Sequence, residues 1–531
     1  MKPLDRRAFL RAAGALTLTP LSRTAHRLAL HPARGQAPAI VKAADALPIM
    51  PQGIAAGDVG GGRAVIWSRC DRAARLFVEY STSDRFQDVR RVPGPAALES
   101  SDFTARVQLT DLPAGQRIFY RVLFQDLTDL RAWSRPETGS FRTPPPAGDT
   151  RDVKLAWSAD TLGQGWGLNP EWGGLRMYET MRQAEPDMFV NVGDTIYADQ
   201  PVQAEVTLDD GTIWRNIVTP AKSKAAETVA DFRGAYQYNL LDAHMRRFNA
   251  EVPQITSWDD HEVHDNWYPT RNIDSEQKYT LKSMSLIAAH AKQAFFEYNP
   301  LPRSGDDPER VYRSVPYGAP LEVFPIDLRS YRSANNANRQ AALGEDARLF
   351  GPSQLDWLKA RLLASRATWK VIASDLPIGL VVPDGASAYE AFANGDDGPP
   401  LGRELEIADL LRFIRDRRIR NTVWITADVH YCAAHYYDPS HARFTEFEPF
   451  WEFVAGPLHA GTFGPNKLEG TFGPQLRFSG VPPGMKGNRP PSEGLQFYGS
   501  MTVSGRTRAM TVALHNVAGK TVYTVELPAR S

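Results

Sequence analysis

The chain has 531 residues, of which 42% are hydrophobic, 10% aromatic and 23% charged, a composition typical of a globular protein with a large core. Lys+Arg and Asp+Glu both number 61, so the overall charge gives no nucleic-acid-binding signal and leaves only a local basic patch open. Two cysteines, Cys70 and Cys432, are too few for a disulfide-stapled scaffold or a structural thiolate zinc site. We do not expect a bridge between them.

The N-terminus carries an export pattern. Asp5-Arg6-Arg7-Ala8-Phe9-Leu10-Arg11 precedes a short apolar run from Ala12 to Leu18. Paired arginines followed by such a run predict a twin-arginine signal peptide and leader over residues 1–39. The run is too short to span a bilayer, and no transmembrane anchor is expected after cleavage. We therefore expect the twin-arginine translocase as a partner and a periplasmic or secreted protein; the alternative is a basic amphipathic start of a cytosolic protein.

Residues 50–143 are expected to form a small β-sandwich domain. Strand-like runs at 64–67, 76–80, 104–109 and 118–124 alternate with turn-rich pieces. The run from Leu112 to Val122 resembles the corner of a fibronectin type III-like domain. The proline-rich piece at 144–148 is typical of a stiff linker.

From Val153 onward, apolar strands alternate with amphipathic helices, which predicts an α/β domain over residues 150–531. Helices are expected at 225–248 and 286–298, and another after a capping-box-like start at Ser353. Runs at 501–503, 511–514 and 521–527 predict antiparallel strands near the C-terminus.

Five strand-like runs of this domain finish on acidic residues: Asp160, Asp194, the pair Asp259–Asp260, Asp375 and Asp428. A single aspartate in such a place is more often a helix cap or turn former. Five together indicate a ligand site, because ligands bind at the carboxyl ends of the strands in α/β sheets. Gathered carboxylates repel one another unless a cation lies among them, so the pattern predicts a site for hard cations such as Ca²⁺, Mn²⁺ or Fe³⁺.

Three motifs are more specific: Asn191-Val-Gly-Asp194-Thr-Ile-Tyr197, Trp258-Asp-Asp-His-Glu262 and Ala427-Asp-Val-His430. They resemble signature blocks of the PhoD branch of the metallophosphoesterases, and Asp327 to Arg332 resembles a further family segment. The resemblance covers most of the chain. It implies an α/β fold, with a metallophosphoesterase-like αββα sandwich core over residues 150–531 preceded by the fibronectin- or Ig-like β-sandwich. It also implies phosphate-ester hydrolysis at a centre that holds Fe³⁺ and Ca²⁺ in the family.

The resemblance also implies roles for individual residues. Asp194 is the expected bridging carboxylate, and Tyr197 the expected phenolate ligand, with a packed core tyrosine as its alternative. Asp260 is expected to bind the second metal, and His261 to face the substrate and protonate the leaving oxygen. The last block is expected to supply the ligands Asp428 and His430.

Two departures from the family pattern concern the metals. Many relatives have Ser-Cys-Gln where this chain has Ser158-Ala159-Asp160, so either Asp160 supplies the missing ligand or the first metal differs. Asp375 stands where the wider superfamily often has a histidine, and is either a ligand or a loop former. Arg329 and Asn266 are candidate substrate-binding residues; for Arg329 a surface ion pair is the alternative.

The predicted reaction is hydrolysis of phosphomonoesters, phosphodiesters or both by a metal-bound hydroxide, with no covalent intermediate. A phospholipase D-like diesterase is an alternative, which an exposed apolar rim at the pocket would favour. A non-catalytic exported binding protein is a further alternative, against which the intact motifs argue.

Overall fold

The computed structural model describes residues 47–530, so the predicted signal peptide at 1–39 lies outside the described residues. Residues 45–531 form one compact unit. None of the helices within the described range is long and apolar enough to cross a membrane.

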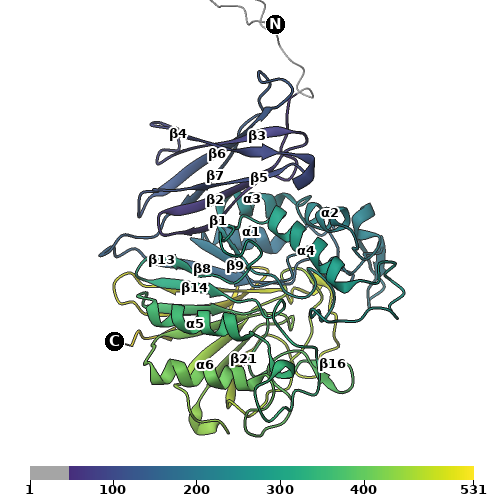
Figure 1. Ribbon diagram of the computed structural model, residues 1–531, viewed down its shortest axis with the longest axis vertical. Helices are drawn as coiled ribbons and strands as arrows, with labels where there is room; N and C mark the ends of the chain where they lie inside the picture. Colours follow the sequence, from purple (N-terminus) through teal and green to yellow (C-terminus); the bar gives the residue numbers. More distant parts are fainter. Residues whose placement is uncertain (1–46, 531) are drawn as a thin grey trace, which may run out of the picture. The chain divides into compact units, whose positions relative to one another are not determined.

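The N-terminal part is a β-sandwich (Figure 1). One layer is the four-stranded sheet β4 (Arg90–Ala97), β3 (Ala74–Ser81), β6 (Arg117–Asp126) and β7 (Glu137–Arg142). The other contains β1 (Ile54–Gly60), β2 (Arg63–Arg69) and β5 (Thr104–Leu109). Alternate residues of both layers, such as Ile66, Val78 and Tyr120, pack in one buried cluster. The strands predicted in this region are confirmed.

The second layer of the sandwich continues into the rest of the chain. β1 pairs in parallel with β12 (Gln254–Thr256), which gives a nine-stranded sheet of order β24-β23-β22-β8-β9-β12-β1-β2-β5. The sequence predicts separate domains at 50–143 and 150–531, but strands from both ranges belong to this one sheet. That division stays a prediction.

Two sheets form the core of the larger part. The remaining strands of the nine-stranded sheet are β8 (Val153–Ser158), β9 (Met188–Asn191), β22 (Phe497–Val503), β23 (Met510–Asn516) and β24 (Thr521–Leu527). The seven-stranded sheet contains β13 (Val315–Tyr317), β14 (Leu321–Pro325), β15 (Trp369–Ala373), β18 (Thr422–Thr426), β20 (Phe450–Val454), β19 (Ala433–Tyr437) and β21 (Pro474–Ser479). Trp157 and Val190 of one sheet share a buried cluster with Ile425 and Phe453 of the other, so the two sheets pack face to face.

Helices cover the outer face of each sheet. The nine-stranded sheet packs against α1 (Arg176–Gln183), α2 (Val229–Asn239), α3 (Ala243–Glu251) and α4 (Met284–Tyr298). The seven-stranded sheet packs against α5 (Pro352–Ala364) and α6 (Glu404–Asp416). The layers follow one another as helices, sheet, sheet and helices (Figure 1), which confirms the predicted αββα sandwich.

Two helix predictions need correction. The helix expected at 225–248 is two helices, because Asp242 caps a new start by accepting a hydrogen bond from the backbone N–H of Met245. The helix expected to begin at Ser353 has no side-chain cap. It begins at Pro352 after Gly351, whose φ of 71° lies in the left-handed region. The three C-terminal strands were predicted correctly and are longer than the predicted runs at 501–503 and 511–514.

Candidate metal centre

The predicted acidic residues meet where the two core sheets end. β8, β9 and β12 are adjacent parallel strands of one sheet, and β15 and β18 are adjacent parallel strands of the other. Their carboxyl ends therefore lie at the same edge of the sandwich. The residues that follow these ends are Asp160, Asp194, Asp260, Asp375 and Asp428.

Several of these residues have an uncommon backbone conformation. φ is 63° at Asp160, 48° at Asp194, 65° at Asp428 and 60° at His430, all in the left-handed region. Non-glycine residues occupy this region rarely, and such strain gathers at functional sites. In this protein the left-handed conformation directs the side chains of these residues from the strand ends into one buried space.

The first group of potential ligands contains Asp160, Asp194 and His430, whose donor atoms all lie within 4.8 Å of one another. Nδ1 of His430 lies 2.6 Å from the carbonyl oxygen of Gly461, so this nitrogen carries the proton and Nε2 keeps its lone pair. The Tyr197 hydroxyl lies 2.9 Å from that Nε2. Burial lowers the pKa of His430 to about 4, so its ring is neutral, as a metal ligand must be.

The second group contains Asp194, Asp260 and His261. Nδ1 of His261 donates to Oδ1 of Asp199 at 2.8 Å, and the backbone N–H of His261 donates to Asp194. Nε2 of the same ring points towards Asp260 at 4.0 Å and Asp265 at 3.7 Å. Since the side chain of Asp265 is 54% exposed, this nitrogen faces the side of the centre nearer to solvent.

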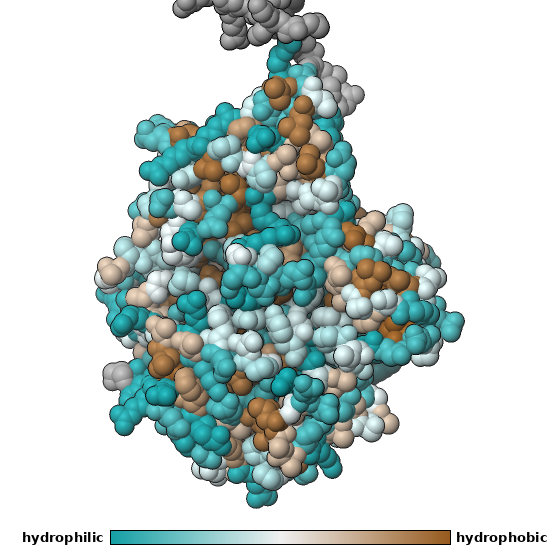
Figure 2. Space-filling model, in the orientation of Figure 1, coloured by the Kyte–Doolittle hydropathy of each residue, from teal (hydrophilic) through white to brown (hydrophobic). Residues whose placement is uncertain are grey.

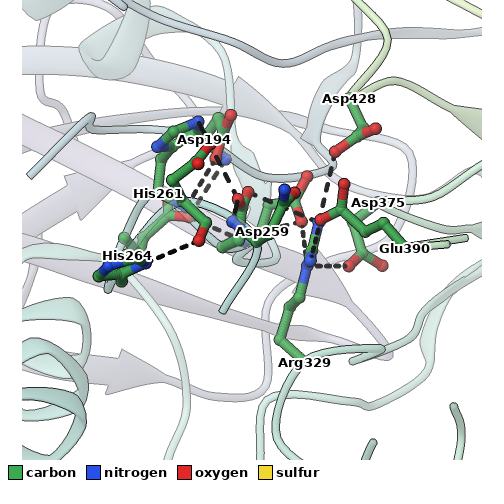
Figure 3. A network of polar contacts seen from close by, with 12 residues as sticks. Asp194, Asp259, His261, His264, Arg329, Asp375, Glu390 and Asp428 are labelled. Atoms are coloured by element: carbon green, nitrogen blue, oxygen red, sulfur yellow. Dashed lines mark hydrogen bonds and ion pairs between the residues drawn. The ribbon is translucent and has the colours of Figure 1, made fainter. Parts of the chain in front are cut away.

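The third group contains Asp259, Asp260 and Asp428, and it surrounds Arg329. The guanidinium group of Arg329 is fully buried. Figure 3 shows it between carboxylates from several loops: Asp259, Asp375, Glu390 and Asp428. Oδ1 of Asp260 also lies 3.5 Å from its Nη2. Arg329 therefore holds this part of the centre together. Its predicted contact with substrate stays a prediction.

The carboxylates lack enough hydrogen bonds for their burial. Within the described residues 47–530, both side-chain oxygens of Asp160 and of Asp375, one of Asp259 and one of Asp260 have no hydrogen-bond partner. Leaving a buried carboxylate oxygen unsatisfied is costly, so these atoms require a further positively charged partner. All are hard oxygen donors, and together with the imidazole of His430 they fit one or more cations.

Electrostatics support the same conclusion. Burial, reinforced by neighbouring carboxylates such as Asp259, raises the pKa of Asp160 well above its usual range. The pKa of Asp428 is likewise raised well above its usual range by burial and by the charges of Glu390 and Asp259. Cations among these groups would restore the ionised forms. For His261, burial alone would lower the pKa, but the carboxylates of Asp260, Asp199 and Asp194 outweigh it and raise the pKa well above its usual value.

Two glycines allow the loops to approach one another. A Cβ atom on Gly193 would lie 2.4 Å from Cβ of Asp259, and φ of Gly193 is 143°. A Cβ atom on Gly456 would lie 2.1 Å from Oδ2 of Asp160. Larger residues at either position would push the ligand carboxylates out of place.

Some residues of the centre carried no assigned role in the sequence analysis. Glu262, the last residue of the Asp-Asp-His-Glu block, accepts hydrogen bonds from the backbone N–H groups of Asp194, Thr195 and Asp259. It thereby ties the loop after β9 to the loop after β12. Asp199 follows Tyr197 by two residues, so the motif that contains Tyr197 could have pointed to it. Nothing in the sequence pointed to Glu390.

Asn266, the other candidate for substrate binding, lies beside the second group. Its backbone N–H donates to Asp260, and its side chain donates to Asp384 at 3.1 Å. It is half-buried and has a φ of 54°. Its predicted contact with substrate also stays a prediction.

Known proteins resemble this chain over most of its length. Residues 155–514 match the PhoD-like phosphatase family, and residues 35–145 match the N-terminal domain of PhoD-like phosphatases. Alkaline phosphatase D of Bacillus subtilis (strain 168) is 26% identical over 449 residues, which are 80% of this chain and 71% of that protein.

Two solved structures share the fold. A structure of PhoD, 20% identical, matches with a TM-score of 0.66 over 91% of this chain and 92% of the other. The purple acid phosphatase PPD1 from yellow lupin (Lupinus luteus) seeds, 12% identical, matches with a TM-score of 0.56 over 91% of this chain and 74% of the other. With its matching sequence blocks, its αββα core and its buried carboxylate centre, the chain belongs to the PhoD-like phosphatase family.

Proposed function

We propose that this protein hydrolyses phosphate esters at a centre of at least two cations. The observation that carries the proposal is the position of Asp194, whose carboxylate belongs to two groups of potential ligands at once. One group reaches Asp160 and His430, and the other reaches Asp260 and His261. A carboxylate shared in this way suits a bridge between two neighbouring cations. Phosphate-ester hydrolysis is the activity to which family membership points.

The bound cations would polarise the phosphoryl group and lower the pKa of the attacking water. Residues of this chain would hold the cations: Asp160, Asp194 and His430 would bind one, and Asp194 and Asp260 would bind the other. Tyr197 adds a phenol oxygen next to His430. The third group, with Asp428, lies next to Arg329 and would complete the centre.

We propose that His261 protonates the leaving oxygen. Nδ1 is fixed on Asp199, so Nε2 points towards the more exposed side, where Asp265 lies. The surrounding carboxylates of Asp260, Asp199 and Asp194 raise the pKa of His261 against the opposing effect of burial, which favours the protonated ring. A histidine in this state can act as a general acid.

The donor atoms favour hard cations. Carboxylate oxygens predominate, with one imidazole from His430 and a phenol from Tyr197. Ca²⁺ prefers carboxylates, and a phenol oxygen is a suitable ligand for Fe³⁺. We therefore propose Ca²⁺ and Fe³⁺ as the resident cations, with Mn²⁺ as the alternative. Ala159 cannot supply the cysteine ligand that the family resemblance implies; we propose that Asp160, which is grouped with Asp194 and His430, binds the cation instead, with a different first metal as the alternative.

One observation favours the phospholipase D-like alternative. Ile213, Ile217 and Val218 are large hydrophobic residues that are 42%, 36% and 42% exposed. Their segment packs against the loop after Asp160, because the backbone N–H of Ile217 donates to the carbonyl oxygen of Leu168 at 2.8 Å. These side chains would form an apolar rim near the centre. On the face shown in Figure 2, hydrophobic residues form separate patches.

Activity towards three substrates would test the proposal. Nitrophenyl phosphate, bis-nitrophenyl phosphate and phosphatidylcholine would be offered to the folded, metal-loaded protein at pH of about 8–10, where a metal-activated water stays deprotonated. The ratio of the two nitrophenyl rates separates monoesterase from diesterase activity. Turnover of phosphatidylcholine alone would support the phospholipase D-like alternative. No turnover of any of the three would contradict hydrolysis of phosphate esters.

For the N-terminus, we propose export by the twin-arginine translocase on the strength of Arg6-Arg7-Ala8-Phe9-Leu10. Replacement of both arginines by lysine should leave the protein in the cytoplasm, where cell fractionation would detect it. Export of that variant at the normal level would contradict a twin-arginine route.

A further inference from the structure

A buried lysine, Lys222, contacts the loop that follows β9. Lys222 ends the short 3-10 turn η4 (Pro220–Lys222) and is 2% exposed, although lysine is seldom buried so completely. Its Nζ atom donates to the carbonyl oxygens of Tyr197 and Gln200, the latter at 2.8 Å. Because Asp199 lies between these two acceptors in the chain, one amine spans the short loop that carries both Tyr197 and Asp199.

Backbone hydrogen bonds hold residues 197–200, here called the Tyr197 loop, between two other segments. On the side of Lys222, the backbone N–H of Val202 donates to the carbonyl oxygen of Lys222 at 2.8 Å, and that of Ala226 donates to Ala198 at 2.9 Å. On the other side, the backbone N–H of Ala198 donates to the carbonyl oxygen of His261 at 2.9 Å. The Tyr197 loop therefore connects Lys222 to the block that contains His261.

The position of the Tyr197 phenol depends on this loop. Its hydroxyl lies 2.9 Å from Nε2 of His430, and its ring centroid lies 4.2 Å from that of His261. Gly163 also approaches the ring closely, since a Cβ atom there would lie 2.5 Å from it. A ring packed this tightly has little room to compensate for a shift of its own backbone. The contact between Lys222 and the carbonyl oxygen of Tyr197 therefore affects where the phenol oxygen lies.

The carboxylate of Asp199 depends on the same loop. Its Oδ1 accepts from Nδ1 of His261 at 2.8 Å, and its Oδ2 accepts from the backbone N–H of Asp265 at 3.2 Å. Hydrogen bonds weaken steeply with poor distance or angle. A rotation of the loop would therefore release the imidazole ring of His261 from the orientation in which Nε2 faces the more exposed side.

The contact with the loop does not depend on the charge of the lysine. Burial lowers the pKa of Lys222 to about 8, against the opposing charge of Asp199. An ammonium group has three N–H donors and a neutral amine has two, so either form can donate to both carbonyl oxygens. Both forms of Lys222 therefore hold the loop.

Building on the proposed hydrolysis of phosphate esters, we propose that Lys222 is a positioning residue that couples the two sides of the catalytic centre. Through the carbonyl group of Tyr197 it sets the position of the phenol oxygen beside the first group of ligands. Through Asp199 it sets the orientation of His261, the proposed acid. Lys222 acts through the backbone of the loop rather than at the reacting atoms.

Metal affinity tests the effect on Tyr197. Lys222→Met removes both hydrogen bonds to the loop. The control Lys370→Met has the same net charge and removes a half-buried lysine that donates to the carbonyl oxygen of Ala367, at the opposite end of β15 from Asp375. We expect Lys222→Met to bind Mn²⁺ at least about 10-fold more weakly at one site, because residues that orient a ligand contribute to metal affinity. Equilibrium dialysis with elemental analysis would measure this, and the control should match the wild type.

Turnover of two esters tests the effect on His261. Nitrophenolate leaves readily without a proton, whereas an alkoxide requires one, so hydrolysis of n-propyl phosphate depends more strongly on a general acid. At saturating metal, we expect the loss of kcat/KM in Lys222→Met to be at least about 10-fold larger for n-propyl phosphate than for nitrophenyl phosphate. If the wild type prefers diesters, dipropyl phosphate and bis-nitrophenyl phosphate would take their place.

A second variant covers the case in which Lys222→Met does not fold. Lys222→Gln keeps a polar N–H donor on a side chain one atom shorter, so it reaches the two carbonyl oxygens less well. It should show the weaker binding of Mn²⁺ and the larger loss with the alkyl ester, both at smaller amplitude.

Either of two results would overturn the coupling. Unchanged affinity for Mn²⁺ would remove the link from Lys222 to Tyr197. Equal losses with the two esters would remove the link to His261 and leave Lys222 a role in stability alone. Turnover of either ester by the metal-loaded wild type supports the proposed hydrolysis whatever the variants do, so the failure of one proposal is distinguishable from the failure of the other.

Discussion

Nδ1 of His261 lies 2.8 Å from Oδ1 of Asp199, and both side chains are buried. Asp199 therefore fixes the orientation of the imidazole ring and leaves Nε2 free to face the substrate. Two positively charged side chains stabilise the ionised form of Asp199. Burial alone would raise the pKa of Asp199, but the charges of His261 and Lys278 lower it. Lys278 Nζ lies 3.3 Å from the other oxygen of Asp199. Asp199 is thus a positioning residue for the proposed acid.

The first prediction concerns the pH dependence of turnover. Asp199→Asn removes a charge that raises the pKa of His261, so that pKa should fall and His261 should lose its proton at lower pH. We expect the alkaline limb of the kcat/KM profile to move to lower pH, with kcat reduced roughly 10- to 100-fold through loss of general-acid function.

A double-mutant comparison provides the control. In a His261→Gln background, Asp199→Asn should have little further effect, because it acts through the ring that has been removed. An additive loss in the double variant would show that Asp199 acts independently of His261.

The second prediction concerns Asp160. Asp160→Asn keeps the size of the side chain and tolerates the left-handed backbone, but removes the negative charge and one of the two ligand oxygens. We expect metal content to fall by about one ion per chain and kcat/KM to fall at least about 100-fold, because charge stabilisation of the transition state is lost. Elemental analysis of the purified variant would measure the ions. Full metal content and turnover would show that Asp160 is no ligand.

The site residues that the sequence predicted are acidic residues that closely follow the end of a strand. The positions of Asp160, Asp194 and Asp428 followed from parallel strands whose carboxyl ends share an edge. Residues that contribute from long loops gave no such signal: Glu390 contacts Arg329 from 61 positions away in sequence. Asp199 carries no regular spacing to His261, 62 positions away, so their contact required the fold.

Local sequence patterns did not predict where every helix ends or which strands pair. Apolar periodicity continues across residues 225–248, and only the capping interaction of Asp242 divides that stretch into α2 and α3. The pairing of β1 with β12 joins segments about 200 residues apart along the chain. Nothing in either segment specifies its partner, so the nine-stranded sheet was not predictable from the pattern of strands.

The third prediction separates two roles of Arg329. Because its buried guanidinium group contacts carboxylates on every side, Arg329→Met should leave those charges uncompensated and lower the free energy of unfolding by about 3–5 kcal/mol. Arg329→Lys should recover only part of this loss, since one ammonium group cannot reach all of these carboxylates. Chemical denaturation would measure both variants. A stable Arg329→Met variant with a raised KM alone would favour direct substrate binding.

The fourth prediction concerns a buried acid pair away from the centre. Burial, together with the hydrogen bond and charge of Glu469, raises the pKa of Glu404 to about 11 from 4.5. The unfolded chain therefore releases this proton at lower pH than the folded chain does, and stability should fall as pH rises above 4.5. The slope is at most about 1.4 kcal/mol per pH unit for one proton.

Glu404→Gln should remove this dependence. The amide resembles the protonated acid and can still donate to Glu469. The variant should therefore match the wild type near a pH of about 5, where little of the stability has been lost, and exceed its melting temperature near a pH of about 9, where the wild type has lost more. Identical pH dependence of the two melting curves would show that Glu404 is ionised in the folded protein.

The most direct test of the central claim is a joint titration of metal content and turnover. Purified protein would be treated with increasing chelator, and each sample would be divided between elemental analysis and hydrolysis of nitrophenyl phosphate or the diester that the protein turns over faster. We predict that turnover falls in step with the ions lost, and that it returns when Ca²⁺ and Fe³⁺, or Mn²⁺, are restored. Undiminished turnover by protein shown to be free of metal would contradict a function for the buried carboxylates around Asp194 in binding catalytic cations.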